Sequence, residues 1–236
     1  MTNINNNCDI FAIRFLSHMT KLVIFDLDGT LLDTLKDLAD ACNHALEMCG
    51  CPHRTLDEYR HLIGGGVTKL LRDALPSERQ SDEMVQIMRS YFIPYYRENL
   101  CVSTRPYDGI EVLLETLSEA GVKLAIASNK FQAGTETLAE NLLGRFEFIK
   151  VLGQREGCPV KPDPQVIREI MAEVPDIKQE DVVYCGDSDV DMFTGHNAGV
   201  RTVGVSWGFR GKEELQACNP WLVVDSPDEI IRAILS

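Results

Sequence analysis

The sequence predicts an α/β fold, namely a doubly wound, Rossmann-like parallel sheet into which an all-helical domain is inserted. The first observation is a series of short apolar runs, rich in β-branched residues, without polar alternation, which is typical of strands buried on both faces. The second is that helical patterns separate these runs, which indicates parallel strands covered by helices. The third is an insertion of about 70 residues between the first two runs, too long for a simple crossover.

Five runs are predicted to form the strands of this sheet. They are Lys21–Asp26, Lys123–Ser128, Phe148–Leu152, Val182–Gly186 and Thr202–Val205. A helix is predicted between Asp108 and Ala120, with Asp108 as its N-cap and Gly121 at its end. Its apolar positions recur with helical spacing, so one face of this helix is expected to pack on the sheet.

The inserted segment reads as helical throughout. From Leu35 an apolar stripe of period 3.6 continues to Gly50, and Val67–Leu75 and Met84–Tyr96 repeat the pattern. Pro94 is expected to kink or end the last of these helices. We expect hinges near Thr34 and Ser103–Pro106. The predicted division is therefore a disordered N-terminal extension at 1–19, a catalytic core at 20–34 plus 104–236, and a helical domain at 35–103.

Composition places the chain among ordinary globular proteins. It is 44% hydrophobic and 25% charged, with a net charge of −13. Nucleic-acid binders usually carry a basic face, so binding to a nucleic acid is not expected. No apolar run approaches the ~20 residues that span a bilayer, and the first 18 residues lack the features of a signal peptide. We expect free cysteine thiols and a cytoplasmic protein. Translation from either Met1 or Met19 is compatible with the sequence.

Polar and charged residues follow four of the predicted strands. They are Asp26-Leu27-Asp28-Gly29-Thr30, Ser128-Asn129-Lys130, Lys161, and Gly186-Asp187 with Asp189 and Asp191. Each alone has a structural explanation, since Asp and Ser often cap helices and an isolated Lys is usually solvated. The carboxyl ends of parallel strands form one crevice, however, where ligands bind. Clustered acids repel one another, so a hard cation with oxygen ligands is expected there.

These segments resemble the four motifs of the haloacid dehalogenase (HAD) superfamily. The matching segments are DLDGTLLDT at Asp26–Thr34, ASNK at Ala127–Lys130, VKPDP at Val160–Pro164 and GDSDVD at Gly186–Asp191, in the family's order. The resemblance covers about residues 20 to 236, and the helical insertion is similar to the superfamily's subclass with an α-helical cap.

The resemblance implies a role for each acid of the first and fourth motifs. Asp26 would attack phosphorus and form an aspartyl-phosphate. Asp28 would protonate the leaving alcohol and then activate the water that hydrolyses the intermediate. Mg²⁺ would be held by the Asp26 carboxylate, the Asp28 backbone carbonyl and Asp187.

The resemblance also implies supporting roles. Ser128 would donate to a phosphoryl oxygen, and Lys161 would offset negative charge on nucleophile and phosphate. Asp191 would orient metal-bound water, and Thr30 would help to place Asp28. Asp189 is expected to be solvated or an N-cap rather than a ligand.

Asp28 favours phosphate ester chemistry over the superfamily's other reactions. The dehalogenases of the superfamily need no acid at this position, and its phosphonate-cleaving branch has a non-acidic residue there. Gly64, Gly65 and Gly66 in the cap, together with Asn129, are expected to bind substrate, although a plain turn between helices would explain the glycines equally well. These glycines, the SNK segment and Val205–Arg210 are similar to the phosphoglycolate phosphatase branch.

The predicted function is Mg²⁺-dependent hydrolysis of a small phosphomonoester, such as 2-phosphoglycolate, through an aspartyl-phosphate. One alternative is a hexose-phosphate mutase or inorganic pyrophosphatase of the same superfamily, and another is a non-enzymatic binding or regulatory member. Bacterial receiver domains also phosphorylate an Asp, but they lack the second acid and the cap. The expected partner is a small phosphorylated metabolite, with neither nucleic acid nor membrane, and the oligomeric state is not indicated.

Overall fold

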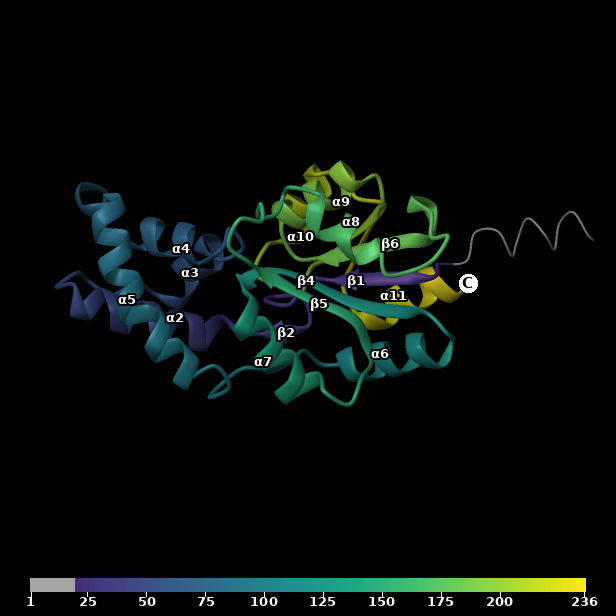
Figure 1. The fold of residues 1–236 in the computed structure, drawn as a ribbon, viewed down its shortest axis with the longest axis horizontal. Coiled ribbons are helices and arrows are strands. Elements are labelled where there is room, and N and C mark those ends of the chain that lie inside the picture. The colour runs from purple at the N-terminus through teal and green to yellow at the C-terminus, as the bar shows by residue number, and fades with distance from the viewer. Residues whose placement is uncertain (1–19) are drawn as a thin grey trace, which may run out of the picture.

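The computed structural model describes residues 20–236, so the predicted extension at 1–19 and the choice of start at Met1 or Met19 lie outside the described residues. A six-stranded parallel sheet forms the centre of the molecule (Figure 1), with the strand order β5-β4-β1-β6-β7-β8. The strands are β1 (Leu22–Phe25), β4 (Lys123–Phe131), β5 (Phe148–Gln154), β6 (Val182–Gly186), β7 (Arg201–Val205) and β8 (Leu222–Val224). The predicted parallel sheet with a helical insertion is confirmed, and β8 is an additional strand.

The strand order determines where a ligand can bind. The chain passes from β1 to β4 on one side of the sheet and from β6 to β7 on the other, so its direction reverses between β1 and β6. Phe25 pairs with Ile126 of β4 and with Cys185 of β6, so these three strands end side by side. Open α/β sheets bind ligands at the carboxyl ends of the strands beside such a reversal.

Helices cover both faces of the sheet, which explains why the strands are apolar without alternation. Val23 and Phe25 belong to one buried cluster with residues of α6 (Ile110–Glu119), α7 (Gln132–Leu143) and α11 (Pro227–Leu235). Leu22 and Ile24 belong to a second cluster with α8 (Gln165–Met171) and α9 (Asp189–Ala198). Successive side chains of a strand point to opposite faces, and Figure 1 shows the two helical layers on either side of the sheet.

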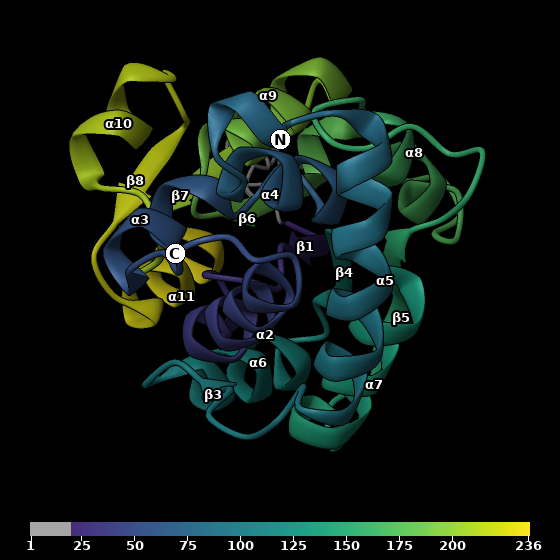
Figure 2. The ribbon, with the colours of Figure 1, turned by 90° about the vertical axis from the view of Figure 1, so that its left-hand side faces the viewer.

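Four α-helices, with a 3₁₀ helix at Ser77–Arg79 between the last two, form the segment inserted between β1 and β4. They are α2 (Leu35–Met48), α3 (Leu56–Leu62), α4 (Val67–Ala74) and α5 (Asp82–Glu98). Figure 2 looks onto these helices, which we call the cap, at the end of the molecule away from the sheet. The short helix α3 lies within the segment predicted to be helical, although no bounds were predicted for it. It begins with a capping box in which Thr55 and Glu58 satisfy each other's backbone N–H groups.

Two local expectations are corrected by the structure. Helix α5 continues through Pro94 to Glu98, so the proline does not end the helix. Helix α6 begins at Ile110 after Gly109, whose φ of +86° belongs to the left-handed region, and Asp108 is not its N-cap. Glycine adopts that conformation without the steric cost that Asp would have.

The two connections between core and cap are tied together. Strand β2 (Leu32–Asp33) in the outgoing connection pairs antiparallel with β3 (Arg105–Pro106) in the returning one. Asp37 in the first turn of α2 is buried, and its carboxylate accepts hydrogen bonds from the backbone N–H groups of Ser103 and Thr104 and from the Thr104 hydroxyl, at 2.8–2.9 Å. These bonds fix the position at which the chain returns from the cap.

Among residues 20–236, no helix has the length and apolar character that crossing a membrane requires. The seven cysteines in that range are all free thiols.

Candidate active site

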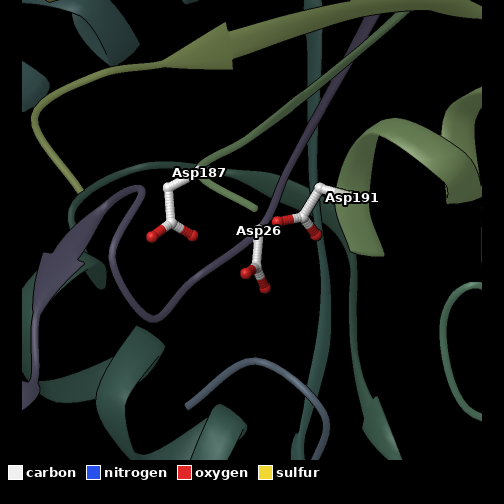
Figure 3. Close-up of side chains that lie close together, drawn as sticks. All are labelled: Asp26, Asp187 and Asp191. Atoms are coloured by element: carbon white, nitrogen blue, oxygen red, sulfur yellow. The ribbon is translucent and has the colours of Figure 1, made fainter. Parts of the chain in front are cut away.

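Three aspartates converge at the carboxyl end of the sheet (Figure 3). Asp26 directly follows β1, Asp187 directly follows β6, and Asp191 lies in the first turn of α9. One carboxylate oxygen from each lies within 4.8 Å of the others, and all three residues are buried. The sequence-predicted acids Asp26, Asp187 and Asp191 are therefore brought together where the chain direction reverses.

Two glycines allow the backbone to approach Asp187 closely. Gly29 has φ +83°, and a Cβ there would lie 2.3 Å from Asp187 Oδ2. A Cβ on Gly208 would lie 2.3 Å from the Cβ of Asp187 and equally close to the carbonyl oxygen of Gly29. The enclosed Asp187 Oδ2 accepts a hydrogen bond of 2.7 Å from the Phe209 N–H. The loops after β1 and β7 thus hold one oxygen of Asp187 and fix the direction of its carboxylate.

Lys161 forms the centre of a buried network beneath Asp26. Its Nζ lies 2.9 Å from Asp26 Oδ1 and 2.7 Å from Asp191 Oδ1, and it donates to the Tyr184 hydroxyl at 2.8 Å. Asp191 Oδ1 also accepts from the Tyr184 hydroxyl at 2.9 Å, and Asp191 Oδ2 accepts from the Ser188 hydroxyl and N–H at 2.6 and 3.1 Å. These four bonds occupy the lone pairs of the Asp191 carboxylate. Asp191 is therefore fitted to hold Lys161 against Asp26. Its expected role in orienting metal-bound water stays a prediction.

The Asp26 carboxylate, unlike that of Asp191, has few hydrogen-bond partners in the described part of the chain. Apart from its contact with Lys161, its Oδ1 is buried without a hydrogen bond from the residues described. Burial raises the pKa of Asp26 to about 7, with the negative charges of Asp191 and Asp28 adding to the effect and Lys161 opposing it. Burial likewise raises the pKa of Asp187 well above its usual range, reinforced by Asp191 and Asp26. An additional cation would stabilise the ionised form of both carboxylates.

The residues at this site fit a divalent metal ion. Asp26, Asp28, Asp187 and Asp191 supply four carboxylates, while Lys130 and Lys161 supply two ammonium groups. The resulting formal charge of −2 equals the charge that one divalent cation would cancel. All the side-chain donors are carboxylate oxygens, which hard cations prefer. The three-aspartate cluster contains the expected side-chain ligands, Asp26 and Asp187, and also Asp191. The Asp28 carboxylate is not part of the cluster, and Asp28 was expected to contribute only its backbone carbonyl.

A cavity of about 40 Å³ lies between this site and the cap. The core lines it with Asp26, Asp28, Ser128, Asn129, Lys130 and Phe131, and the cap with Leu38, Ile63, Gly64, Gly66, Val67, Leu70, Phe92 and Tyr96. The hydroxyl oxygen of Ser128 accepts from the Lys130 N–H at 3.2 Å, so its hydrogen remains available for an oxygen in the cavity. The core side of the cavity is polar and the cap side is largely apolar.

Lys130 is a site residue for which the sequence analysis assigned no role. Its Nζ donates to both oxygens of the Asp28 carboxylate, at 2.8 and 2.9 Å, and lies 4.8 Å from the centre of the Tyr96 ring. Ser128 and Lys130 are two residues apart on β4, so strand alternation alone would have placed both on the same side. Tyr96 was recognised only as part of an apolar helical stripe.

The residues expected to bind substrate divide into two groups. Gly64 and Gly66 line the cavity, with φ of +118° and +84°, whereas Gly65 is not among its lining residues. The Asn129 side chain donates to the carbonyls of Gly64 and Lys161 at 3.0 and 3.1 Å and accepts from the Lys161 N–H at 2.8 Å. Asn129 therefore joins the third motif to the cap loop, and substrate binding by these residues stays a prediction.

Thr30 and Arg210 also help to join the loops around the site. The Thr30 carbonyl accepts from the Trp207 indole at 3.0 Å, while its buried hydroxyl has no partner among residues 20–236. Arg210, in the loop after β7, donates to carbonyls at the end of α3, including those of His61 and Ile63 at 3.0 and 3.1 Å. Two side chains of the core, Arg210 and Asn129, thus donate hydrogen bonds to the cap loop.

The chain is similar in sequence and in fold to haloacid dehalogenase-like hydrolases, several of which are named phosphoglycolate phosphatase. A profile described as haloacid dehalogenase-like hydrolase matches residues 23–205. A protein from Aquifex aeolicus named phosphoglycolate phosphatase is 33% identical over 217 residues, covering 90% of this chain and 95% of its own length. Another of that name, from Neisseria meningitidis, is 35% identical over 197 residues, covering 79% and 80%. A solved structure from Lactobacillus delbrueckii subsp. bulgaricus, provisionally named phosphoglycolate phosphatase, superposes with a TM-score of 0.85 at 31% identity and covers 92% of this chain and 98% of that one.

Proposed function

The chain belongs to the haloacid dehalogenase-like hydrolases, and from this premise we propose that it is a Mg²⁺-dependent phosphatase acting on a small phosphomonoester, 2-phosphoglycolate or a close analogue. One observation carries the proposal. Asp26 presents a buried carboxylate that lies 2.9 Å from a lysine, and Asp28, two residues further on, lines the same cavity. A nucleophile and a separate acid–base group beside one enclosed space are what phosphate ester hydrolysis through a covalent intermediate requires.

In the proposed first step, a carboxylate oxygen of Asp26 forms a bond to phosphorus as the bond between phosphorus and the leaving oxygen breaks. Asp28 delivers a proton to that leaving oxygen, which departs as an alcohol. In the second step Asp28 takes a proton from a water molecule that attacks the aspartyl-phosphate, and Asp26 is released with inorganic phosphate. The same carboxyl group thus serves as acid and then as base.

Two residues of the core would stabilise the negative charge of the phosphoryl group. Lys161 is held 2.9 Å from Asp26 by Asp191 and Tyr184, so its ammonium group is in place before substrate arrives. Such preorganised charge costs no reorganisation during reaction. The Ser128 hydroxyl, which lines the cavity, would donate to a phosphoryl oxygen.

The expected ligands of Mg²⁺ are the Asp26 carboxylate, the Asp28 backbone carbonyl and Asp187. When bound there, the ion neutralises the buried carboxylates and favours approach of the phosphate dianion. The cap limits the entry of water, because the side chains it turns toward the cavity are apolar apart from Tyr96.

The choice of 2-phosphoglycolate draws on two further observations. Relatives at 30–35% identity carry the name phosphoglycolate phosphatase, and the cavity beside Asp26 and Asp28 is small, with room for roughly three water-sized groups. We further propose a cytoplasmic location, which the free thiols of the seven described cysteines support.

The test measures phosphate release by the full chain with Mg²⁺ and with EDTA. The panel contains 2-phosphoglycolate, hexose phosphates and pyrophosphate. We expect Mg²⁺-dependent release with the highest kcat/KM on 2-phosphoglycolate, and loss of at least about 10³-fold in kcat for Asp26→Asn. Asp189→Asn is the matched control, because Asp189 lies in the fourth motif between Asp187 and Asp191 but outside the metal cluster. Full Mg²⁺-dependent activity in Asp26→Asn would contradict the proposal, and a preference for pyrophosphate or interconversion of hexose phosphates would favour the alternatives.

A further inference from the structure

Lys130 is the one basic residue among those that line the cavity between core and cap. Lys161, the other lysine of the site, is engaged with Asp26 and Asp191 and is not part of that lining. Any negative charge on a substrate beyond its phosphoryl group would therefore meet a single matching cation, namely Lys130.

The Lys130 ammonium group depends on an anionic partner. Its side chain is only 2% exposed, and its neighbours are the Asp28 carboxylate and the face of the Tyr96 ring. A buried ammonium group without a partner is strongly unfavourable. In the structure Asp28 meets this need with both of its oxygens.

Catalysis as proposed above makes a competing demand on Asp28. Both Asp28 oxygens accept from Lys130, so turning one of them toward the leaving oxygen of the substrate would draw it away from Lys130. Lys130 would then lose part of its pairing while remaining enclosed by the cap. A negatively charged group on the substrate, close to the leaving oxygen, would replace what Asp28 withdraws.

The cap side of the cavity is suited to a short acid and poorly suited to a sugar. Its side chains are aliphatic or aromatic, and the hydroxyl groups of a sugar would lose their hydrogen bonds to water against such a wall. The exception is Tyr96, whose buried hydroxyl has no hydrogen-bond partner among residues 20–236.

We propose that Lys130 binds a carboxylate at the distal end of the substrate, in exchange for Asp28, and so makes the enzyme selective for short phosphorylated carboxylic acids. This inference rests on the proposed phosphatase function. It assigns Lys130 direct contact with substrate, in contrast to a lysine that only holds Asp28 in place.

The test compares 2-phosphoglycolate with ethyl phosphate, which has a methyl group in place of the carboxylate. The two esters differ in intrinsic reactivity, so their kcat/KM values are compared as a ratio, 2-phosphoglycolate over ethyl phosphate. The informative quantity is this ratio in the unaltered protein divided by the same ratio in Lys130→Met. We expect this quotient to be about 10–100, the effect of one charge-assisted hydrogen bond. Lys130→Arg, which keeps the charge, should retain part of the preference. Lys123→Met is the control, because Lys123 is an exposed lysine on the same strand.

Equal losses on both esters in Lys130→Met would overturn the inference and leave the phosphatase function standing. Absence of Mg²⁺-dependent hydrolysis of either ester by the unaltered protein would instead refute the proposed function, and the inference with it. If Lys130→Met does not fold, competition in the unaltered protein decides. Glycolate should then inhibit ethyl phosphate hydrolysis at concentrations where ethanol does not, and equally weak inhibition by both would refute a carboxylate site.

Discussion

Replacing Asp37 by Asn tests how the cap is attached to the core. The Asp37 carboxylate is 3% exposed and accepts hydrogen bonds from three donors of the returning connection, the N–H groups of Ser103 and Thr104 and the Thr104 hydroxyl. A hydrogen bond to a charged acceptor contributes about 1 kcal/mol more than a neutral one. The amide of Asn would also turn its NH₂ group toward a backbone N–H. A neutral side chain costs less to bury, which offsets part of these losses. We therefore expect a net loss of about 2 kcal/mol in the free energy of unfolding.

Urea denaturation with EDTA present measures this loss, and thermal unfolding should show a decrease of about 4–8 °C in Tm. Asp40→Asn is the matched control, because Asp40 lies on the same helix with an exposed carboxylate paired only to Lys36; its effect should stay within about 0.5 kcal/mol. A double-mutant cycle with Thr104→Val should give a coupling of at least about 0.5 kcal/mol. If Asp37→Asn is no more destabilising than Asp40→Asn, the carboxylate does not hold the connection and the reasoning is wrong.

Two further predictions concern the metal site. Gly29→Ala should lower kcat at least about 100-fold while costing only about 1–2 kcal/mol of stability, because the added Cβ would lie 2.3 Å from Asp187 Oδ2 in a left-handed conformation. Steady-state kinetics measures the first effect and urea denaturation the second. A near-normal kcat would contradict this prediction. The increase in Tm that Mg²⁺ produces should be larger at pH 8 than at pH 5.5. Burial raises the pKa of Asp26 from 3.8 to about 7 and that of Asp187 in the same direction, so in the metal-free protein their contribution to stability is present below pH 3.8 and is lost as pH rises through 7, while protons compete with the metal at the lower pH. Thermal scans with Mg²⁺ and with EDTA measure it, and an equal or larger increase at pH 5.5 would count against this account.

Local patterns were sufficient for the main elements of the fold. The predicted strands β1, β4, β6 and β7 are present because each contains a continuous buried run, which burial between two helical layers requires. Strand β5, at the edge of the sheet, is partly exposed and contains Lys150. Helix α2 follows its stripe from Leu35 because one face of the helix packs in the buried core. Strand β8 was missed because it has only three residues, two of them partly exposed. Helix α3 was not delimited within the predicted helical insertion, because its seven residues carry only one buried side chain, Tyr59. Short elements of this kind form where their neighbours supply hydrogen bonds and packing.

The sequence by itself determined which chemical groups this protein brings to its site. Asp26, Ser128 and Asp187 each follow or end an apolar strand, and parallel strands bring such ends to one edge. Order along the chain therefore sufficed to expect a cluster of acids and a cation to balance them.

Only the tertiary structure decided what each group is free to do. Asp191 and Asp26 are both buried aspartates, but Lys161, Tyr184 and Ser188 occupy the lone pairs of Asp191, whereas Asp26 has an oxygen that lies beside Lys161 and accepts no hydrogen bond from the described residues. Lys130 meets Asp28 across 102 positions of the chain, so no local pattern could reveal their pairing. A residue type sets which bonds a side chain can make, while partners distant in sequence set which of those bonds remain available for a ligand.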